Sequence, residues 1–249
     1  MAFKRLCCSG MLAALLTVPA FGALPTVTAA AQDVSSRGAT LVSRPGILSR
    51  WGFVQRRVVA RRGPDPAAAV VGRLGLRTED GTDELVLVIA RMRGSDGRRW
   101  VRVRLPIRPV GSTGWIPASA LEPLVAVRTW LRIDTRQLRA TLIRSGKVIF
   151  RARVAVGRAK WPTPRGDFYI RSKLVGFPSD TIYGALAFGT SAKSEVLTDW
   201  PRGGIVGIHG TNRPGLIPGR VSHGCIRMTN RDILTLARLM PVGTPLSIR

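Results

Sequence analysis

Apolar residues recur in short runs along the first half of the chain, a pattern typical of β-strands. Residues 85–89 form a continuous apolar run, residues 100–105 alternate between apolar and polar positions, and residues 114–117 resemble a short closing strand. Gly, Pro and Asp residues that favour turns separate these runs. The pattern predicts a small β-barrel within residues 50–125, in which Trp100 and Trp115 are core residues.

The second half of the chain continues the β pattern and adds one helix. Residues 130–134, 137–143 and 148–150 predict strands joined as two antiparallel hairpins, with Ser145-Gly146-Lys147 as the second turn. Residues 230–240 show helical spacing of apolar positions, with Asn230 as the expected N-cap and Pro241 and Gly243 after the end. The chain is therefore predicted to be all-β with one or two short helices, and residues 127–249 form its second domain.

The N-terminus has the organisation of a secretory signal. Lys4 and Arg5 precede an uncharged, largely apolar run over residues 6–23, and small residues follow. We expect a signal peptide over residues 1–31, cleaved after residue 23 or residue 31, and a linker over residues 32–49. An uncleaved membrane anchor is the alternative. The predicted location is the cell wall or periplasmic space, with membrane contact only through this signal.

The net charge favours an anionic partner. The 249 residues include 39 Lys and Arg against 14 Asp and Glu, a formal charge of +25. Because the chain is predicted to be exported, anionic cell-wall polymers are the expected partners. Nucleic acid is not expected, since the basic residues are scattered and show no recognised nucleic-acid-binding module.

A thiol and two imidazoles are concentrated near the C-terminus. Cys7 and Cys8 lie in the predicted signal, which leaves Cys225 as the single cysteine, and the only histidines, His209 and His223, lie within 16 residues of it. A Pro- and Gly-rich segment separates His209 from Cys225, and such a segment can double back. We expect Cys225 to be a nucleophile, His209 its general base and His223 a group that orients or polarises the pair.

Neighbouring residues suggest how such a site is completed. Gly224 allows close approach of a substrate, and the amides of Gly224 and Cys225 are candidates for binding an oxyanion. Arg227 is expected on the same face as Cys225, where it lowers the thiol pKa or holds a carboxylate; pairing with Asp232 is the structural alternative. His209, His223 and Cys225 are zinc-ligand types, but no fourth ligand is apparent and Arg227 would repel a cation, so no metal is expected.

The motif around these residues resembles that of the L,D-transpeptidase catalytic domain, or YkuD domain. His209-Gly210-Thr211 and Ser222-His223-Gly224-Cys225-Ile226-Arg227-Met228 carry the resemblance, together with the earlier Thr163-Pro164-Arg165-Gly166-Asp167-Phe168. It covers residues 127–249 and implies a mixed β-sandwich with a groove beneath a flap. It also implies that Cys225 is the nucleophile, that His209 transfers protons and that His223 supports the site, which is shaped by Ser222, Gly224, Gly210 and Thr211.

The two domains carry further expectations. Residues 50–125 resemble a bacterial SH3-like domain, which implies either binding of cell-wall peptides or a packing role. In the expected flap the family often has Asn-Pro-Leu-Gly-Pro, whereas this chain has Tyr183-Gly184-Ala185-Leu186-Ala187-Phe188. Tyr183 and Phe188 are candidates to line the donor groove, with core packing as the alternative.

The resemblance implies acyl transfer between peptidoglycan stem peptides. Cys225 would form a thioester with a tetrapeptide stem, release D-alanine and give a 3→3 cross-link without a cofactor. The alternatives are an L,D-carboxypeptidase or another cysteine-dependent stem-peptide hydrolase, and a non-catalytic wall-binding protein. NlpC/P60-type peptidases place Cys before His, and the sortase motif Thr-Leu-x-Thr-Cys is absent from this chain.

Overall fold

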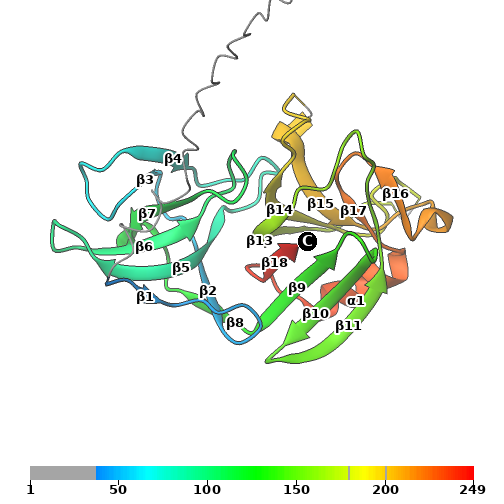
Figure 1. Ribbon diagram of the computed structural model, residues 1–249, viewed down its shortest axis with the longest axis horizontal. Helices are drawn as coiled ribbons and strands as arrows, with labels where there is room; N and C mark the ends of the chain where they lie inside the picture. Colours follow the sequence, from blue (N-terminus) through cyan, green and yellow to red (C-terminus); the bar gives the residue numbers. More distant parts are fainter. Residues whose placement is uncertain (1–37, 179, 200) are drawn as a thin grey trace, which may run out of the picture. The chain divides into compact units, whose positions relative to one another are not determined.

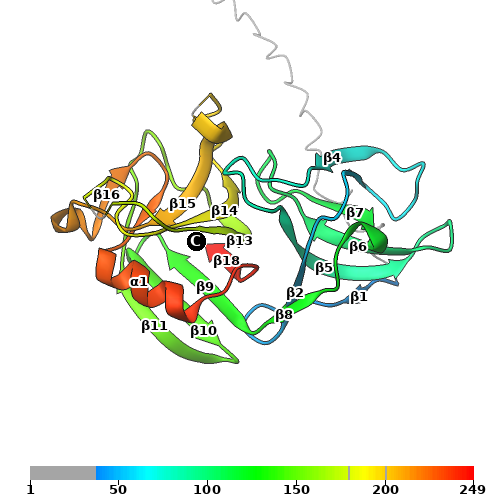
Figure 2. The same cartoon turned by 180° about the vertical axis from the view of Figure 1, so that it is seen from behind.

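A computed structural model describes residues 38–178, 180–199 and 201–249. The predicted signal peptide, residues 1–31, and the first part of the predicted linker lie outside the described residues. The described chain is mostly β, with two sheets and one α-helix (Figures 1 and 2). Among the described residues we find no helix with the length and apolar character needed to cross a bilayer.

The first sheet contains the strands expected from the alternating pattern. Its order is β4-β3-β7-β6-β5-β2-β8, and β1 pairs separately with β5. The strands are β1 (Thr40–Leu41), β2 (Ser49–Phe53), β3 (Val58–Arg61), β4 (Val70–Leu74), β5 (Leu85–Arg93), β6 (Arg99–Arg104), β7 (Thr113–Pro117) and β8 (Val125–Val127), with a 3₁₀ turn at Ala118–Ala120. Trp100 and Trp115 are buried, as predicted. The SH3-like resemblance stays a prediction, and part of the expected linker forms β1.

The second sheet is mixed, with ten strands in the order β11-β10-β9-β18-β13-β14-β15-β17-β12-β16. Both predicted hairpins are present as antiparallel pairs, whereas β9 with β18 and β15 with β17 are parallel. The strands are β9 (Thr129–Asp134), β10 (Arg139–Arg144), β11 (Lys147–Arg153), β12 (Ala155–Gly157), β13 (Gly166–Leu174), β14 (Ala187–Lys193), β15 (Ile205–His209), β16 (Gly219–Ser222), β17 (Ile226–Arg227) and β18 (Pro245–Ile248). Short 3₁₀ turns lie at Pro201–Gly204 and Pro214–Leu216.

The single α-helix, α1 (Asn230–Leu239), packs on this sheet through its apolar face. Ile233 and Leu236 are fully buried in the same core cluster as residues of β9, β13, β15 and β17. The predicted N-cap is wrong: Thr229 caps the helix, because its hydroxyl oxygen accepts the Asp232 amide at 3.1 Å. The Asn230 side chain is consequently available for a different contact, described below.

Buried contacts join the first sheet to the second. Tyr169 on β13 belongs to an apolar cluster that also contains residues of β2, β5 and β8. The Arg171 guanidinium, also on β13, forms ion pairs with Glu84 and with Glu79. Glu79 and Glu84 belong to the segment between β4 and β5, which therefore lies against β13 (Figures 1 and 2). This contact brings the segment between β4 and β5 close to the candidate site.

Candidate active site

The structure brings His209 and Cys225 to neighbouring positions of one sheet. His209 ends β15, and Cys225 immediately precedes β17. These two strands pair in parallel, with Ile208 opposite Ile226 and His209 opposite Arg227. The segment between them doubles back through the 3₁₀ turn Pro214–Leu216 and strand β16, as the Pro and Gly content predicts. The pairing of β15 with β17 therefore brings His209 and Cys225 together although 16 residues separate them in the sequence.

Two cavities meet at the thiol and the imidazole. The smaller, of about 90 Å³, also contains Ser222, His223 and Arg227 in its wall. The larger, of about 400 Å³, extends along β14 and past Phe177. Both are lined by four residues, Tyr183, Ile205, His209 and Cys225. The Cys225 thiol therefore lies between the two cavities and borders both of them.

The Cys225 thiol is held in its protonated form. The Gly207 amide donates a hydrogen bond to Sγ at 3.4 Å. Burial raises the pKa of the Cys225 thiol above its ordinary value, although this hydrogen bond and the Arg227 charge act in the opposite direction. A thiol with a raised pKa needs a base to become nucleophilic at neutral pH.

His209 has the properties of such a base. Its Nδ1 lies 2.6 Å from the Gly210 carbonyl oxygen, which can only accept, so Nδ1 donates and Nε2 keeps its lone pair. The side chain is only 3% exposed. The pKa of His209 is lowered to about 4: burial is the main cause, the Gly210 hydrogen bond opposes the shift, and the Arg227 charge adds to it. The imidazole is therefore neutral and able to accept a proton at neutral pH.

His223 occupies a different environment from His209. Its ring stacks on Trp161, with centroids 4.1 Å apart and planes inclined by 30°. Arg158 and Lys160 both lie over the Trp161 ring, at 4.8 and 5.0 Å from its centroid. Burial and the charges of Arg158 and Arg227 lower the pKa of His223. The aromatic stack makes His223 part of the wall of the smaller cavity.

The turn that carries Cys225 is fixed by hydroxyl groups. The Ser222 hydroxyl donates to the Cys225 carbonyl at 2.6 Å and accepts the Gly224 amide at 3.1 Å. Thr163 donates to the Gly224 carbonyl at 2.8 Å. Gly224 has a φ of +115°, which a side chain would strain, so its backbone conformation explains the glycine. The expectation that the Gly224 amide binds an oxyanion is wrong, because Ser222 already accepts its hydrogen.

Gly210 and Thr211 follow His209 in the chain, and their backbone groups form hydrogen bonds that hold this segment in place. The Asn230 Oδ1 accepts the amides of Thr211 and Ala185, each at 3.1 Å. A Cβ atom on Gly210 would lie 2.2 Å from that same oxygen. Asn230 therefore ties the segment after Tyr183 to the end of β15. Sequence reasoning missed this role because Asn230 was assigned to the helix cap.

Arg227 and Tyr183 both reach the cavities. Arg227 borders the smaller cavity with Cys225, as expected from their two-residue spacing, and its buried Nε has no hydrogen-bond partner among the described residues. The alternative pairing with Asp232 is not formed within the described chain, where the Asp232 carboxylate accepts the Thr229 hydroxyl. The Tyr183 ring lies 5.2 Å from the His209 ring, edge to face. Phe188 is buried in the core and also borders the larger cavity.

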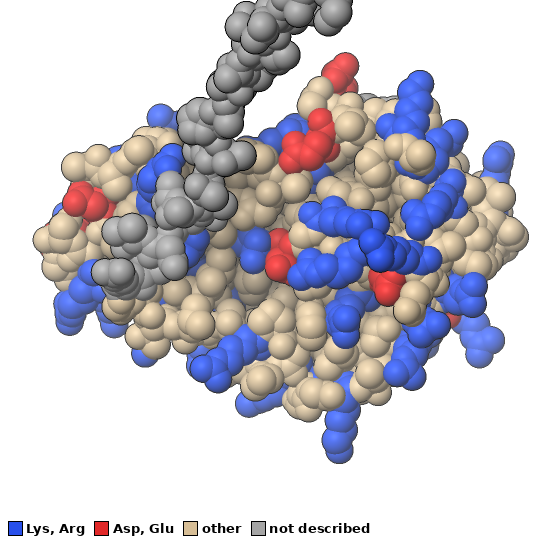
Figure 3. All heavy atoms as spheres, viewed as in Figure 1, with Lys and Arg blue, Asp and Glu red and all other residues tan. Residues whose placement is uncertain are grey.

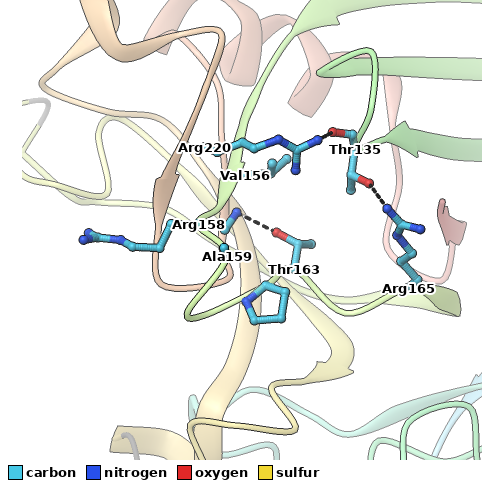
Figure 4. A pocket seen from close by; sticks show the side chains of 9 residues that line it. Thr135, Val156, Arg158, Ala159, Thr163, Arg165 and Arg220 are labelled. Carbon is cyan, nitrogen blue, oxygen red and sulfur yellow. Dashed lines mark hydrogen bonds between the residues drawn. The ribbon is translucent and has the colours of Figure 1, made fainter. Parts of the chain in front are cut away.

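An arginine-lined pocket of about 310 Å³ lies next to the turn that carries Cys225 (Figure 4). Arg220 donates to the Thr135 carbonyl at 2.7 Å, and Arg165 approaches the Thr135 hydroxyl at 3.5 Å. Figure 4 shows Arg158 pointing away from these two side chains. Thr163 belongs both to this pocket and to the hydrogen bonds of the Cys225 turn. No sequence pattern indicates this pocket, since its residues come from separate strands and turns.

The residues that the structure describes contain no group of three or more His, Cys, Asp or Glu side chains arranged to hold a metal ion. The walls of the two cavities are instead formed by one thiol, two imidazoles, one guanidinium, the carboxylate of Asp80, hydroxyl groups and apolar groups. The site therefore supplies a nucleophile and a base, which are the groups that acyl transfer requires.

A thiol and a buried imidazole in the wall of the same cavities are the nucleophile and base of cysteine-dependent acyl transfer. The family model described as the L,D-transpeptidase catalytic domain, YkuD, matches residues 128–248. A putative L,D-transpeptidase YkuD of Bacillus licheniformis is 36% identical over 135 residues, which cover 53% of this chain and 72% of that protein. The chain therefore belongs to the L,D-transpeptidase family.

The chain is also similar to a second curated protein and, over about half of its length, to solved structures. The putative L,D-transpeptidase YkuD of Bacillus subtilis is 37% identical over 110 residues, which cover 43% of this chain and 58% of that protein. Among solved structures, the catalytic domain of the E. faecium L,D-transpeptidase is 24% identical, with a TM-score of 0.36 over 49% of this chain and 96% of that chain. Bdellovibrio bacteriovorus Bd1075 is 26% identical, with a TM-score of 0.40 over 49% of this chain and 48% of that chain.

Proposed function

We propose that the protein is a peptidoglycan L,D-transpeptidase that forms 3→3 cross-links through a Cys225 thioester and releases D-alanine. The observation that carries this proposal is the meeting of two cavities at Cys225 and His209. A reaction between two stem peptides needs a donor and an acceptor to reach the same sulfur atom, one after the other. Two spaces that share one thiol and one base suit that requirement.

In the first half-reaction, His209 Nε2 takes the proton of the Cys225 thiol as Sγ attacks the carbonyl carbon of the third stem residue. His209 then gives that proton to the nitrogen of the departing D-alanine. The C–N bond breaks and a thioester remains on Cys225. The Arg227 guanidinium, in the wall of the smaller cavity, is suited to hold the carboxylate of D-alanine.

In the second half-reaction, the acceptor amine enters and His209 removes its proton. The nitrogen attacks the thioester carbonyl, the C–S bond breaks, and the Cys225 thiolate regains the proton from His209. Water in place of the amine would give hydrolysis, which is the L,D-carboxypeptidase alternative. The neutral state of His209 favours both steps, because each begins with proton acceptance.

Muropeptide analysis tests the proposal directly. Purified protein incubated with a disaccharide tetrapeptide is expected to yield free D-alanine and a 3→3 linked dimer, both measured by liquid chromatography and mass spectrometry. Tripeptide without dimer would support the carboxypeptidase alternative. Unchanged substrate would overturn catalysis on stem peptides and leave the non-catalytic wall-binding alternative.

We further propose that the protein is exported to the cell wall or periplasmic space and that its positive charge binds anionic wall polymers. Basic side chains outnumber acidic ones over the face shown in Figure 3. The arginine-lined pocket offers Arg165 and Arg220 for such a polymer. We also propose that residues 50–125 form an SH3-like domain, which either binds cell-wall peptides or packs against the second domain.

Binding to purified cell walls is expected to weaken steeply as salt rises, because screening acts on contacts between exposed charges. The measurement is the bound fraction in a co-sedimentation assay at increasing salt concentration. Replacing both Arg165 and Arg220 by glutamine should lower binding at low salt. Arg139→Gln on β10, which removes an exposed charge outside the pocket, is the matched control. Binding that is constant across the salt range would contradict the charge-based proposal.

A further inference from the structure

The wall of the larger cavity contains one carboxylate, that of Asp80, which lies in the segment between β4 and β5 of the first sheet. We propose that Asp80 binds the side-chain ammonium of a diamino acid at the third position of the donor stem. This inference rests on the proposed function, because it assigns a substrate contact to the same site. Asp80 would then set specificity for the residue whose carbonyl Cys225 attacks.

The position of Asp80 follows from a series of contacts that leads to the thiol. Asp80 lines the larger cavity together with Cys225 and His209. A Cβ atom on Gly189 would lie 3.2 Å from Asp80 Oδ2, so the carboxylate lies against β14 at a residue without a side chain. Gly189 pairs with Gly207 on β15, whose amide donates to Cys225 Sγ. The carboxylate and the thiol therefore occupy one cavity, separated by the width of two paired strands.

Ion pairs hold the segment that carries Asp80 on the catalytic domain. Arg171 on β13 binds Glu84 and Glu79, and Lys193 at the end of β14 binds Glu79 at 2.8 Å. The Asp80 amide donates to the Thr78 hydroxyl at 3.2 Å. Arg171 and Glu84 are both buried, so separating them would leave an uncompensated buried charge. The carboxylate of Asp80 is thus positioned by contacts that extend beyond its own turn.

The first sheet also borders the other side of the site. Arg108, between β6 and β7, donates to the carbonyl oxygens of Ser194 and Gly203, at 2.8 and 2.9 Å. Ser194 belongs to the wall of the smaller cavity. The first sheet therefore supports both cavities, and Asp80 is the residue from it that borders the larger one.

The distances suit a diamino side chain. Because paired strands lie about 4.8 Å apart, the contacts through Gly189 and Gly207 place the carboxylate roughly 8–12 Å from Sγ. An extended side chain of four methylenes carries its ammonium roughly 6 Å from its Cα, judged from C–C bond lengths of about 1.5 Å. With a hydrogen bond of about 2.8 Å, the ammonium reaches Asp80 when the carbonyl carbon lies at Sγ.

Charge complementarity favours the same orientation of the donor. Four of the 14 acidic residues lie within residues 79–84, in a chain whose formal charge is +25. The smaller cavity presents Arg227, and the larger presents Asp80. A stem peptide with a terminal carboxylate and a side-chain ammonium would therefore have its two opposite charges directed to opposite sides of Cys225.

The test compares acylation by two synthetic tetrapeptide stems that differ only at the third residue, L-lysine or its uncharged analogue L-norleucine. Intact-mass spectrometry measures the rate of Cys225 adduct formation. Asp80→Asn should lower kcat/KM for the lysine stem roughly tenfold and leave the norleucine stem within about twofold. Asp83→Asn is the matched control, because it removes the same charge from the same segment at an exposed pair with Arg77.

The possible results separate this inference from the proposed function. Selective loss on the lysine stem in Asp80→Asn, with Asp83→Asn like wild type, supports the assignment. Equal losses on both stems, or a wild type without preference for lysine, overturn the Asp80 contact alone. The absence of an adduct with either stem on wild type overturns the proposed function and, with it, this inference. A thermal melt of each variant establishes that the fold is retained.

Discussion

Replacing Cys225 by alanine is expected to lower turnover of tetrapeptide stems by roughly 10⁴-fold or more, the size of loss seen when a covalent nucleophile is removed. The reason is that both half-reactions of the proposed mechanism use one sulfur atom. The two cavities meet at that atom, and the described chain holds no other cysteine in their walls. Without the thiol, His209 has no partner to deprotonate, so neither the thioester nor the cross-link can form.

Intact-mass spectrometry after incubation with a disaccharide tetrapeptide measures this effect. Wild type should gain a mass equal to the donor without D-alanine, and Cys225→Ala should gain none. Cys225→Ser keeps a side chain of similar size and so separates lost chemistry from lost packing. The assignment fails if the adduct persists on Cys225→Ala, since another residue would then be the acylated group.

The elements that sequence predicts well are those whose determinants are local. The alternating run at residues 100–105 appears as β6, and the Ser145-Gly146 turn joins β10 to β11. The helix extent is predicted to within one residue. The thiol and the base were predicted because the chain has only two histidines and, outside the predicted signal peptide, one cysteine. Local periodicity and scarcity of residue types carried these predictions.

The residues that sequence reasoning missed depend on partners distant along the chain. Asn230 binds amides 19 and 45 residues away, and Arg171 binds Glu84 across 87 residues. The Gly224 amide was misassigned because its conformation and its bond to Ser222 follow from the folded turn. Asp80 lies within residues 50–125, where the sequence predicts no residue of the site. Propensity and motif spacing carry no information on such contacts.

These contacts change the view of the domain organisation. The sequence predicts a first domain, which either binds cell-wall peptides or packs against its neighbour, followed by a catalytic one. In the structure the segment between β4 and β5 lies on β13, and Arg108 supports the segment that follows β14. A catalytic domain produced alone would therefore lack part of the wall of its larger cavity. Experiments on specificity are best performed on the chain that retains both sheets.

His209→Asn is expected to lower turnover by about 10²–10⁴-fold, the usual contribution of a general base. Asparagine can still donate to the Gly210 carbonyl, as Nδ1 of His209 does at 2.6 Å, but it has no lone pair suited to accept the thiol proton. Steady-state release of D-alanine measures the loss. His223→Ala is the comparison, and it should lose less than about tenfold if that ring only shapes the cavity. Wild-type turnover by His209→Asn would move the base role to His223.

The lowered pKa of His209 provides a second readout, which separates its chemistry from its packing. The pKa is about 4 in the folded protein and 6.5 when unperturbed, so the unfolded chain binds the proton more tightly. The contribution of His209 to the free energy of unfolding is therefore fully present above pH 6.5. It is lost as the pH drops towards 4 and amounts to on the order of 3 kcal/mol. Denaturant unfolding across this range should show that slope in wild type and a smaller slope in His209→Asn.

Wild-type turnover should also persist below pH 6, because a base with a pKa near 4 remains neutral there. An acid limb near pH 6.5 would contradict a buried, neutral His209 as the base.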